Sequence, residues 1–422
     1  MMTITPARRI ANIRYAIRDI MTEAEKVRAL GRTLTPLNIG DPAAVGGFRA
    51  PEHLVEAVRQ AWADHRYEYA PSAGLPEARE AVAADHVRRG HRVNPADVII
   101  TAGLSEAIRF LITALVDPGD EVLVPAPGYP LYQSVLGEVG GVAREYLLDE
   151  SAGWAFSPAD VAARVNERTR ALVLVSPSNP TGRVFTETEL RGAVAICRRH
   201  GLLLICDEVY DRLAYGVDGP VPSAARFCGD DLPVVTLNGL SKNWLLPGAR
   251  VGWMVFHNAA VQRDFQAAVQ KLANARLCAP SPQQWAVRPA LEGSQEHLVA
   301  FRRALAERAQ TVVEAIQSLP GVSLVPPQAA FYAMPRLHLD HPALRSYGSD
   351  TELVLAWLRR TGVLTVPGSG FGQRPGTHHF RVVTLAPPKT LDRALRSLGE
   401  ILADGAPAAE VAFPVGAVPA EC

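Results

Sequence analysis

The chain has very little lysine. Of its 43 basic side chains four are lysines, and the other 39 are arginines. Arginine stays protonated at any ordinary pH, whereas a desolvated lysine amine loses its proton and attacks carbonyl groups. One of the four, Lys242, follows the apolar run 234–237 in the segment Leu-Asn-Gly-Leu-Ser-Lys-Asn. We therefore consider Lys242 as a nucleophile, against the alternative of a surface lysine at a strand end.

The chain also lacks net charge and long apolar runs. Its 43 basic and 43 acidic side chains cancel, so composition does not indicate a nucleic acid or an anionic membrane as a partner. No apolar stretch approaches the roughly 20 residues that span a bilayer. The first residues, Met-Met-Thr-Ile-Thr-Pro, do not lead into an apolar segment, so we expect no secretory signal.

Cysteine and metal-binding patterns are sparse. The cysteines are odd in number, scattered and free of CxxC pairs, which is typical of reduced thiols and predicts a cytoplasmic protein. The eleven histidines form no HExxH motif and no zinc spacing, so we expect no metal. The five cysteines are Cys197, Cys206, Cys228, Cys278 and Cys422.

The pattern of predicted secondary structure changes near residue 97. Residues 1–45 form an N-terminal arm with a helix at about 22–30, and helices are expected at 51–64 and 76–89. Beyond residue 97, short apolar runs alternate with helical stretches, which predicts a mostly parallel sheet covered on both faces. The expected strands are 98–101, 121–124, 171–175, 202–205, 234–237 and 251–256, and the helices between them are 105–116, 130–138 and 187–200.

The last third of the chain indicates a smaller α+β domain. A long helix at about 294–319 precedes short β-like pieces and a final helix at 390–403. The β-like pieces are 321–325, 330–334, 363–366 and 379–384. We thus expect an arm at 1–45 that belongs to the small domain, a large domain at 46–296 and a small domain at 297–403. Residues 404–422, rich in Ala, Pro and Val, are expected to be a disordered tail.

Two of the predicted strands lead into groups suited to a phosphate. Strand 98–101 runs into Gly103-Leu104-Ser105, where free N–H groups at a helix start attract an anion. Strand 234–237 leads to Lys242, and Arg250, which follows eight residues later, can bind a phosphate through two N–H groups. Each feature alone has a structural explanation, a helix cap for Ser105 and a surface charge for Arg250.

Three further strands end in aromatic, amide and acidic side chains. Strand 121–124 leads to Tyr129 and Tyr132, either of which can place a ring over a flat ligand or pack in the core. Strand 171–175 leads to Asn179, held between prolines, as a rigid amide or as an Asx turn. Strand 202–205 leads to Asp207, a buried acid that requires a partner, and to Tyr210.

These groups all follow the carboxyl ends of predicted parallel strands, so we expect them at one edge of the sheet. Ligands of open α/β sheets bind beyond that edge. An amine, a phosphate seat, an aromatic ring and a buried acid together match one cofactor. Pyridoxal 5′-phosphate has an aldehyde, a phosphate, a flat ring and a ring nitrogen that prefers an acidic partner. The sequence therefore predicts a pyridoxal-phosphate site around Lys242.

Over residues 10–402 the chain resembles the class I/II aminotransferases of pyridoxal-phosphate fold type I. The motifs are Asn38-Ile-Gly-Asp-Pro, Tyr69-Ala-Pro-Ser-Ala-Gly, Pro-Gly-Tyr129-Pro, Ser-Asn179-Pro-Thr-Gly, Asp207-Glu-Val-Tyr210, Ser-Lys242-Asn with Arg250, and His-Phe-Arg381-Val-Val. Several stretches are most similar to the bacterial alanine (glutamate–pyruvate) aminotransferases. They are Leu-Val-Pro-Ala-Pro-Gly-Tyr-Pro-Leu-Tyr, Asn-Gly-Leu-Ser-Lys, Arg276-Leu-Cys-Ala, Phe-Arg-Val-Val-Thr-Leu and the segment 12–19.

The resemblance implies a fold and a role for each residue. The fold is α/β, with a mostly parallel seven-stranded sheet flanked by helices in the large domain and a smaller α+β domain, in a homodimer. The implied catalytic residues are Lys242, which forms the Schiff base and moves the proton, Asp207, which pairs with the ring nitrogen, and Tyr210. The implied cofactor contacts are Tyr129 stacked on the ring, Tyr210 and Asn179 on its phenolic oxygen, Gly103, Leu104, Ser105, Ser241 and Arg250 on the phosphate, and Tyr69 on the phosphate of the neighbouring subunit.

The resemblance also implies how the substrate is bound. Arg381 would hold the α-carboxylate, assisted by Asn179 and the Gly40 backbone, and Tyr15 would close over the substrate. Arg276 is a candidate for the distal carboxylate of glutamate, or else a salt-bridged surface arginine.

The sequence departs from the family pattern at three places. Gly239 replaces a serine that many relatives carry three residues before the lysine, and Ala329 replaces a glycine. The Tyr69-Ala-Pro-Ser-Ala-Gly stretch is more similar to the aspartate and aromatic branches. Alanine or glutamate is the first choice of amino donor, while aromatic or specialised aminotransferases and a C–S β-lyase remain alternatives. A regulator with an added DNA-binding domain is disfavoured, because the N-terminal arm is short and neutral. A nicotinamide dehydrogenase is disfavoured, because Gly368-Ser-Gly-Phe-Gly lacks GxGxxG spacing.

Overall fold

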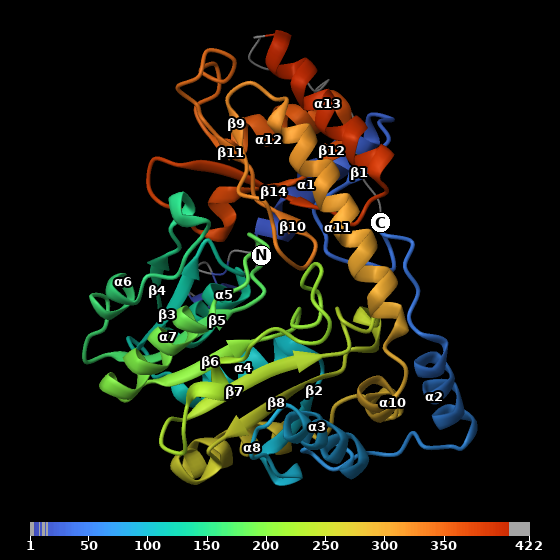
Figure 1. Ribbon diagram of the computed structural model, residues 1–422, viewed down its shortest axis with the longest axis vertical. Coiled ribbons are helices and arrows are strands. Elements are labelled where there is room, and N and C mark those ends of the chain that lie inside the picture. The colour runs from blue at the N-terminus through green and yellow to red at the C-terminus, as the bar shows by residue number, and fades with distance from the viewer. Residues whose placement is uncertain (1–3, 8, 11–12, 14–15, 405–422) are drawn as a thin grey trace.

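The computed structural model describes residues 4–7, 9–10, 13 and 16–404, and its centre is a seven-stranded sheet (Figure 1). The strand order is β2-β8-β7-β6-β5-β3-β4, and only β8 runs antiparallel to its neighbours in this sheet. The strands are β2 (Val98–Thr101), β3 (Glu121–Ala126), β4 (Val142–Leu147), β5 (Thr169–Val175), β6 (Leu203–Asp207), β7 (Val234–Gly239) and β8 (Gly252–His257).

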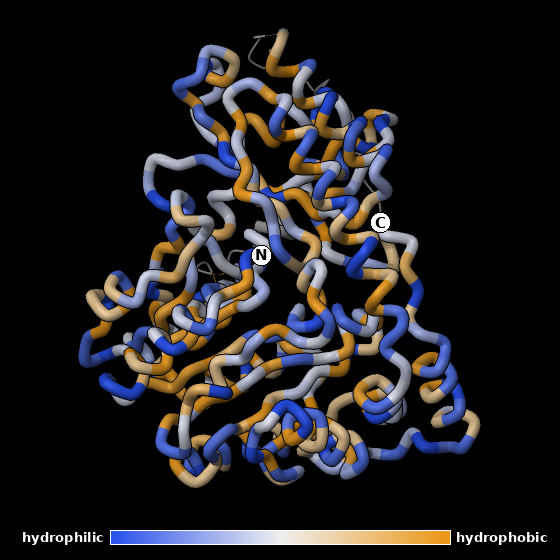
Figure 2. The backbone as a smooth tube through the Cα atoms, in the orientation of Figure 1, coloured by the Kyte–Doolittle hydropathy of each residue, from blue (hydrophilic) through white to orange (hydrophobic). Residues whose placement is uncertain are grey.

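Helices cover both faces of this sheet, so its strands are apolar on both sides. Along β6, Ile205 packs with α4, α5 and α8, whereas its neighbours Leu204 and Cys206 point to the other face, toward α7. In Figure 2 much of the tube through this sheet is orange, the colour of hydrophobic residues. The helices of this part are α2 (Glu52–Ala63), α3 (Pro76–Arg88), α4 (Leu104–Leu115), α5 (Leu131–Val139), α6 (Pro158–Ala162), α7 (Glu187–His200), α8 (Arg263–Arg276), α9 (Ser281–Gln284) and α10 (Val287–Glu292).

A smaller α+β unit lies beside the large sheet, at the top of Figure 1. Its antiparallel strands pair in the order β10-β14-β11-β9, with β13 also on β14, and β1 pairs with β12 in a separate two-stranded ribbon. Its helices are α1 (Ala16–Ala29), α11 (Glu296–Gln317), α12 (Asp350–Thr361) and α13 (Pro388–Asp404). Its strands are β1 (Thr35–Pro36), β9 (Val322–Ser323), β10 (Tyr332–Ala333), β11 (Arg336–Leu337), β12 (Val363–Leu364), β13 (Val366–Pro367) and β14 (His378–Val383).

The predicted fold class is confirmed, and the six predicted strands of the large sheet are found within two residues of their expected ends. The sequence analysis gave no range for α6, α8, α9, α10, α12, β1, β4 or β11. The expected N-terminal helix at 22–30 belongs to a longer helix, α1. The expected tail falls on residues that, apart from Asp404 at the end of α13, lie outside the described part of the chain.

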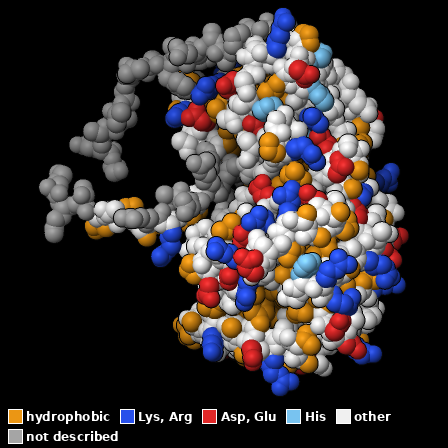
Figure 3. Space-filling model, turned by 90° about the vertical axis from the view of Figure 1, so that its left-hand side faces the viewer, with side chains coloured by type: hydrophobic (Ala, Val, Ile, Leu, Met, Phe, Trp, Pro, Cys, Tyr) orange, Lys and Arg blue, Asp and Glu red, His pale blue; other side chains and the backbone are white. Residues whose placement is uncertain are grey.

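The described surface carries both signs of charge. Figure 3 shows basic and acidic side chains interspersed on one face, in agreement with the zero formal charge. Within the described ranges, no helix is long and apolar enough to cross a membrane.

Candidate active site

The site lies where the parallel strands end. Strands β2, β3, β5, β6 and β7 run in one direction, so their carboxyl ends share one edge, and the chain enters β8 from the same edge. A cavity of about 130 Å³ opens there. Its lining consists of Leu104, Ser105, Tyr129, Val175, Asn179, Asp207, Val209, Tyr210, Ser241, Lys242, Pro247 and Arg250. Nine residues chosen from the sequence thus line one cavity, although they come from five separate segments.

Lys242 is held against the segment that precedes the large sheet. Its Nζ donates to the Gly40 carbonyl oxygen at 2.7 Å. The pKa of the Lys242 amine is lowered to about 8: burial is the largest cause, the charges of Arg250 and Arg381 act in the same direction, and Asp41 and Asp207 oppose them. A usable fraction of the amine is therefore neutral and nucleophilic near neutral pH.

The lowered pKa predicts how the cofactor-free protein captures an aldehyde. Only the neutral amine attacks, so the capture rate should rise about tenfold for each pH unit below the pKa and level off above pH 8. The measurement is the growth of visible absorbance after mixing cofactor-free protein with pyridoxal 5′-phosphate between pH 6 and 10. A rate that keeps rising to pH 10, the behaviour of an ordinary lysine, would contradict the assigned environment.

Asp207 ends β6 and is 3% exposed. Burial raises the pKa of its carboxyl to about 6. The Val209 N–H (3.3 Å), the Tyr132 hydroxyl (3.2 Å) and the charge of Lys242 oppose that effect. A buried carboxylate with few donors gains from a cationic partner such as a protonated ring nitrogen.

The helix start at β2 forms a close-packed cradle. Gly103 precedes α4 with φ of 79°, a conformation that glycine adopts without strain. A methyl group in place of its hydrogen would come within 2.3 Å of Arg250 Nη2. The guanidinium of Arg250 thus lies close to Gly103, at the start of α4, so a cation and a helix N-terminus are near each other, as a phosphate site requires.

The departure at Gly239 has a packing reason. Gly239 is paired with Gly252 of β8. A Cβ at position 239 would lie 2.7 Å from the Val251 carbonyl oxygen and 2.9 Å from Leu104 Cδ1. A serine therefore does not fit here without a shift of the backbone. The absence of a side chain at position 239 allows α4 to pack closely against the sheet.

Arg381, on β14, is 1% exposed and lies beside the cavity. Its Nη1 donates to Asn179 Oδ1 at 3.0 Å, and its Nη2 donates to the Asn38 carbonyl oxygen. The guanidinium also lies 4.9 Å from the ring of Tyr332 and 4.6 Å from the ring of Phe371. These contacts fix the orientation of a buried cation that can bind a carboxylate through two N–H groups.

The sequence analysis missed Tyr332 as a site residue. The Tyr332 and Tyr210 hydroxyls are 2.8 Å apart, and a Cβ at Gly40 would lie 2.4 Å from the Tyr332 hydroxyl. Tyr332 thereby connects Tyr210 with the Gly40 segment. The available signal was the Phe-Tyr pair in the expected β piece 330–334, which follows the family departure at Ala329 and to which the sequence analysis gave no role in the site.

The described part of the chain does not place three of the predicted residues at the cavity. Tyr69 is 81% exposed and outside the cavity lining, and Tyr15 falls outside the described residues. Arg276, at the end of α8, forms an ion pair with Glu106 (3.2 Å) and donates to the Ser72 carbonyl oxygen. The predicted roles of these three residues stay predictions.

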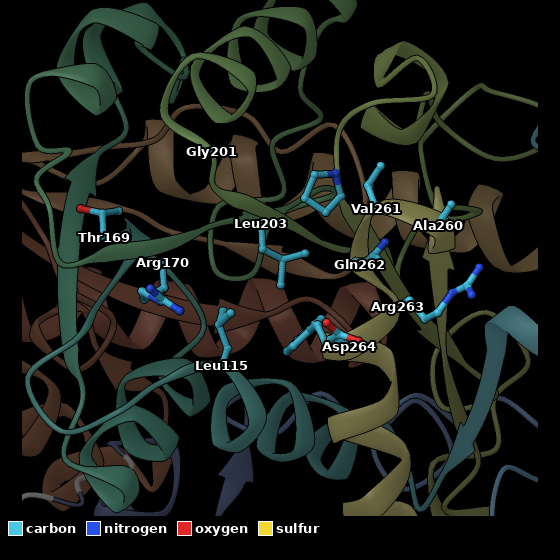
Figure 4. Close-up of a pocket in the computed structure, with 12 residues that line it drawn as sticks. Leu115, Thr169, Arg170, Gly201, Leu203, Ala260, Val261, Gln262, Arg263 and Asp264 are labelled. Atoms are coloured by element: carbon cyan, nitrogen blue, oxygen red, sulfur yellow. The ribbon is translucent and has the colours of Figure 1, made fainter.

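A larger cavity, of about 510 Å³, lies at the opposite edge of the sheet, at the amino-terminal ends of β5 and β6 (Figure 4). Thr169 and Leu203, the first residues of these strands, line it, together with Arg263 and Asp264 of α8. Its lining contains no lysine and no buried acid at a strand end. The chemistry of the lining, and not the volume, therefore favours the smaller cavity as the candidate site.

The comparisons with known proteins agree with this geometry. Residues 32–398 match the family model of class I and II aminotransferases. The chain is 37% identical to the glutamate-pyruvate aminotransferase AlaA of Haemophilus influenzae, covering 94% of this chain and 97% of that protein. It is 36% identical to an alanine aminotransferase of Mycobacterium tuberculosis, over 93% and 91%. An alanine aminotransferase from Pyrococcus furiosus superposes with a TM-score of 0.89 at 34% identity, covering 95% and 100%.

The chain therefore belongs to the class I and II aminotransferases. It is an amino-acid aminotransferase of pyridoxal-phosphate fold type I, and its cofactor is pyridoxal 5′-phosphate. The residues present fit this cofactor. The cavity is lined by one amine, one buried acid and an aromatic ring. It adjoins the start of α4, where Arg250 lies so close to Gly103 that a methyl group on Gly103 would contact it. The alternative of a C–S β-lyase is not favoured.

Proposed function

We propose that this aminotransferase exchanges the amino group between alanine and 2-oxoglutarate, giving pyruvate and glutamate. This choice of substrates rests on the relatives named glutamate-pyruvate aminotransferase and alanine aminotransferase. They are 36–37% identical over more than nine-tenths of the chain. The buried guanidinium of Arg381 supports it as the seat for the carboxylate that all four compounds share.

We assign the cofactor contacts to the residues of the cavity. When bound, the cofactor supplies an aldehyde that bonds to amines and a ring that withdraws the electron pair released at the substrate's α-carbon. Lys242 holds the aldehyde and Asp207 the ring nitrogen. Tyr129 covers the ring, and Tyr210 and Asn179 donate to its phenolic oxygen. The phosphate is assigned to Gly103, Leu104, Ser105, Ser241 and Arg250.

One group of the chain, the Lys242 amine, is assigned to move the substrate's α-proton. The Lys242 amine, with its lowered pKa, would take the proton from the substrate's α-carbon and return it. Arg381, assisted by Asn179 and the Gly40 backbone, holds the α-carboxylate and so orients the bond to that proton. The rigid contacts of Arg381 keep this orientation without a rearrangement at the moment of reaction.

A panel of amino donors with 2-oxoglutarate or pyruvate as acceptor tests the substrate choice. Alanine with 2-oxoglutarate, and glutamate with pyruvate, should give the highest kcat/KM. Initial-rate plots for the two substrates should be parallel, because both bind the same site in turn. A tenfold or larger preference for an aromatic or branched donor over alanine would overturn this choice.

We also propose that Arg276 binds the distal carboxylate of glutamate. Its guanidinium is a partly buried cation close to the start of α4, and its ion pair with Glu106 holds it there. We expect Arg276→Ala to lower kcat/KM for glutamate by about tenfold or more relative to norvaline, because one charge-assisted hydrogen bond to the substrate is lost. Norvaline has a side chain of similar reach without the carboxylate, so an unchanged ratio of the two substrates would remove Arg276 from the site.

We propose that the enzyme is a homodimer in which Tyr69 reaches the phosphate of the other subunit and Tyr15 closes over the substrate. The α2 helix and the loop after it expose Val55, Trp62, Tyr67 and Tyr69, and the rings of Trp62 and Tyr67 are 5.7 Å apart. Exposed aromatic side chains in one region are typical of a protein interface. Sedimentation of the purified protein tests the dimer, and a monomer mass at micromolar concentration would exclude it.

We propose the domain boundaries given above, an arm at 1–45, a large domain at 46–296 and a small domain at 297–403. The cavity residues then belong to the large domain, and Arg381 belongs to the small one. We further propose a cytoplasmic location, which the free cysteines Cys197, Cys206, Cys228 and Cys278 support. Fluorescence microscopy of a tagged protein tests the location.

A further inference from the structure

The two oxygens of the Asp207 carboxylate have different partners. Oδ1 accepts from the Val209 N–H at 3.3 Å, and Oδ2 accepts from the Tyr132 hydroxyl at 3.2 Å. Among the described residues, Tyr132 is the side chain that donates a hydrogen bond to Asp207. The two residues are 75 positions apart in the chain and come from different elements, α5 and β6.

Tyr132 is held firmly by packing. It lies in the first turn of α5, is 1% exposed, and packs among apolar side chains of the sheet face that α4 and α5 cover. Burial, and after it the charge of Asp207, raises the pKa of the Tyr132 phenol well above its usual value. The phenol therefore stays protonated at working pH and is a permanent donor.

A donor at this place acts on the protonation of Asp207. Burial alone favours the neutral acid, which cannot hold a proton on a ring nitrogen. The Tyr132 hydroxyl favours the anion and also fixes the carboxylate plane. The other titratable groups around the pair are Lys242, Tyr129, Tyr210, Cys206 and Glu208. Of these, Lys242 also favours the anion, but its charge falls as its pKa of about 8 is approached.

We propose that Tyr132 is a positioning residue, whose hydroxyl keeps the Asp207 carboxylate ionised and oriented toward the ring nitrogen of the bound cofactor. This proposal rests on the assignment of Asp207 made under the proposed function. The segment after β3 would then have two roles, because Tyr129 is assigned to the cofactor ring and Tyr132, three residues later, to the Asp207 carboxylate.

The test compares two tyrosines that each lose only a hydroxyl. Tyr146 is also fully buried, and its hydroxyl donates to the Val173 carbonyl oxygen at 2.8 Å, so Tyr146→Phe is the matched control for Tyr132→Phe. Infrared titration of the full-length protein without cofactor follows the carboxyl band that Asp207→Asn removes. We expect Tyr132→Phe to raise the midpoint of this band by about one pH unit and Tyr146→Phe to leave it in place.

The loaded enzyme gives a second measurement. Tyr132→Phe should lower kcat about tenfold while KM for the amino acid stays within about twofold, because the hydroxyl touches the acid and not the substrate. An unchanged midpoint in Tyr132→Phe, or an equal shift in Tyr146→Phe, would overturn the proposal. If Tyr132→Phe does not fold, the C–O band of the phenol in the unaltered protein still decides. That band should change at the pH where Asp207 titrates, and an invariant band counts against the contact.

The design separates the two assignments. Full turnover by Asp207→Asn would remove Asp207 from the ring nitrogen, and the proposal for Tyr132 would fail with it. The infrared midpoint is measured without the cofactor, so it reports the contact between Tyr132 and Asp207 whatever role the acid has.

Discussion

Lys242→Ala should abolish turnover and leave no visible absorbance from covalently bound cofactor. The variant loses the amine that bonds to the aldehyde and the group that moves the α-proton. General acid–base catalysis alone contributes about 10²–10⁴-fold, so we expect kcat to fall by at least about 10³-fold. Spectra and rates of the purified variant, saturated with pyridoxal 5′-phosphate, measure both effects.

The control for this variant is another of the four lysines. Lys271 is an exposed residue of α8, so Lys271→Ala removes a cation without touching the cavity and should keep the wild-type spectrum and rate. Reduction with borohydride followed by peptide mapping places the label. A label on Lys271, or an active and yellow Lys242→Ala protein, would refute the assignment of the nucleophile.

The grouping of the predicted site residues around one cavity could be predicted, because it depends on which strands are parallel in the sheet. Each buried run is short, apolar on both faces and followed at once by a polar group, as for β6 and Asp207. Once the runs are identified as parallel strands, their carboxyl ends must share an edge. Seven of the nine predicted residues that line the cavity follow from this rule, and Leu104 and Ser241 follow from the family resemblance. No distance between them can be read from the sequence.

The missed elements carry weaker signals. β4 is an edge strand whose residues Arg144 and Glu145 are only partly buried, so its apolar pattern is faint. α12 lay inside a stretch without an expected element, although Ser349 caps its start and Gly362 ends it in the left-handed conformation. Both are short-range cues that compete with many similar Ser and Gly positions in this chain.

Contacts between distant segments could not be predicted. The hydrogen bond from Lys242 to Gly40 joins positions 202 residues apart, and the pairing of the Tyr210 and Tyr332 hydroxyls joins positions 122 apart. The packing that excludes a serine at Gly239 involves the neighbouring strand and α4. Such contacts depend on how the two units meet, which periodicity within a segment does not encode.

The second large effect is expected at Arg381. Arg381→Lys keeps the charge but loses the two-pronged N–H arrangement that binds a carboxylate and the contacts of the guanidinium with the rings of Tyr332 and Phe371. We expect kcat/KM for alanine to fall by about 10²–10³-fold, since a buried two-bond contact to a charged substrate is lost. Cofactor affinity should change by less than about threefold, because the phosphate and ring contacts are assigned to other residues.

The contact of Arg381 with Asn179 requires that substrate binding and cofactor binding be measured separately. Its Oδ1 accepts from Arg381, while its amide is assigned to the cofactor's phenolic oxygen, so a loosened Asn179 could weaken both ligands. The measurement is therefore a pair of values on one preparation, the half-saturating concentration of pyridoxal 5′-phosphate and kcat/KM for alanine. Arg336→Lys, on the neighbouring β11 where Arg336 pairs with Glu150, is the control for an arginine of the small unit outside the cavity. Equal losses of cofactor and substrate binding in Arg381→Lys would show that Arg381 supports the site as a whole, and the carboxylate seat would have to be sought elsewhere.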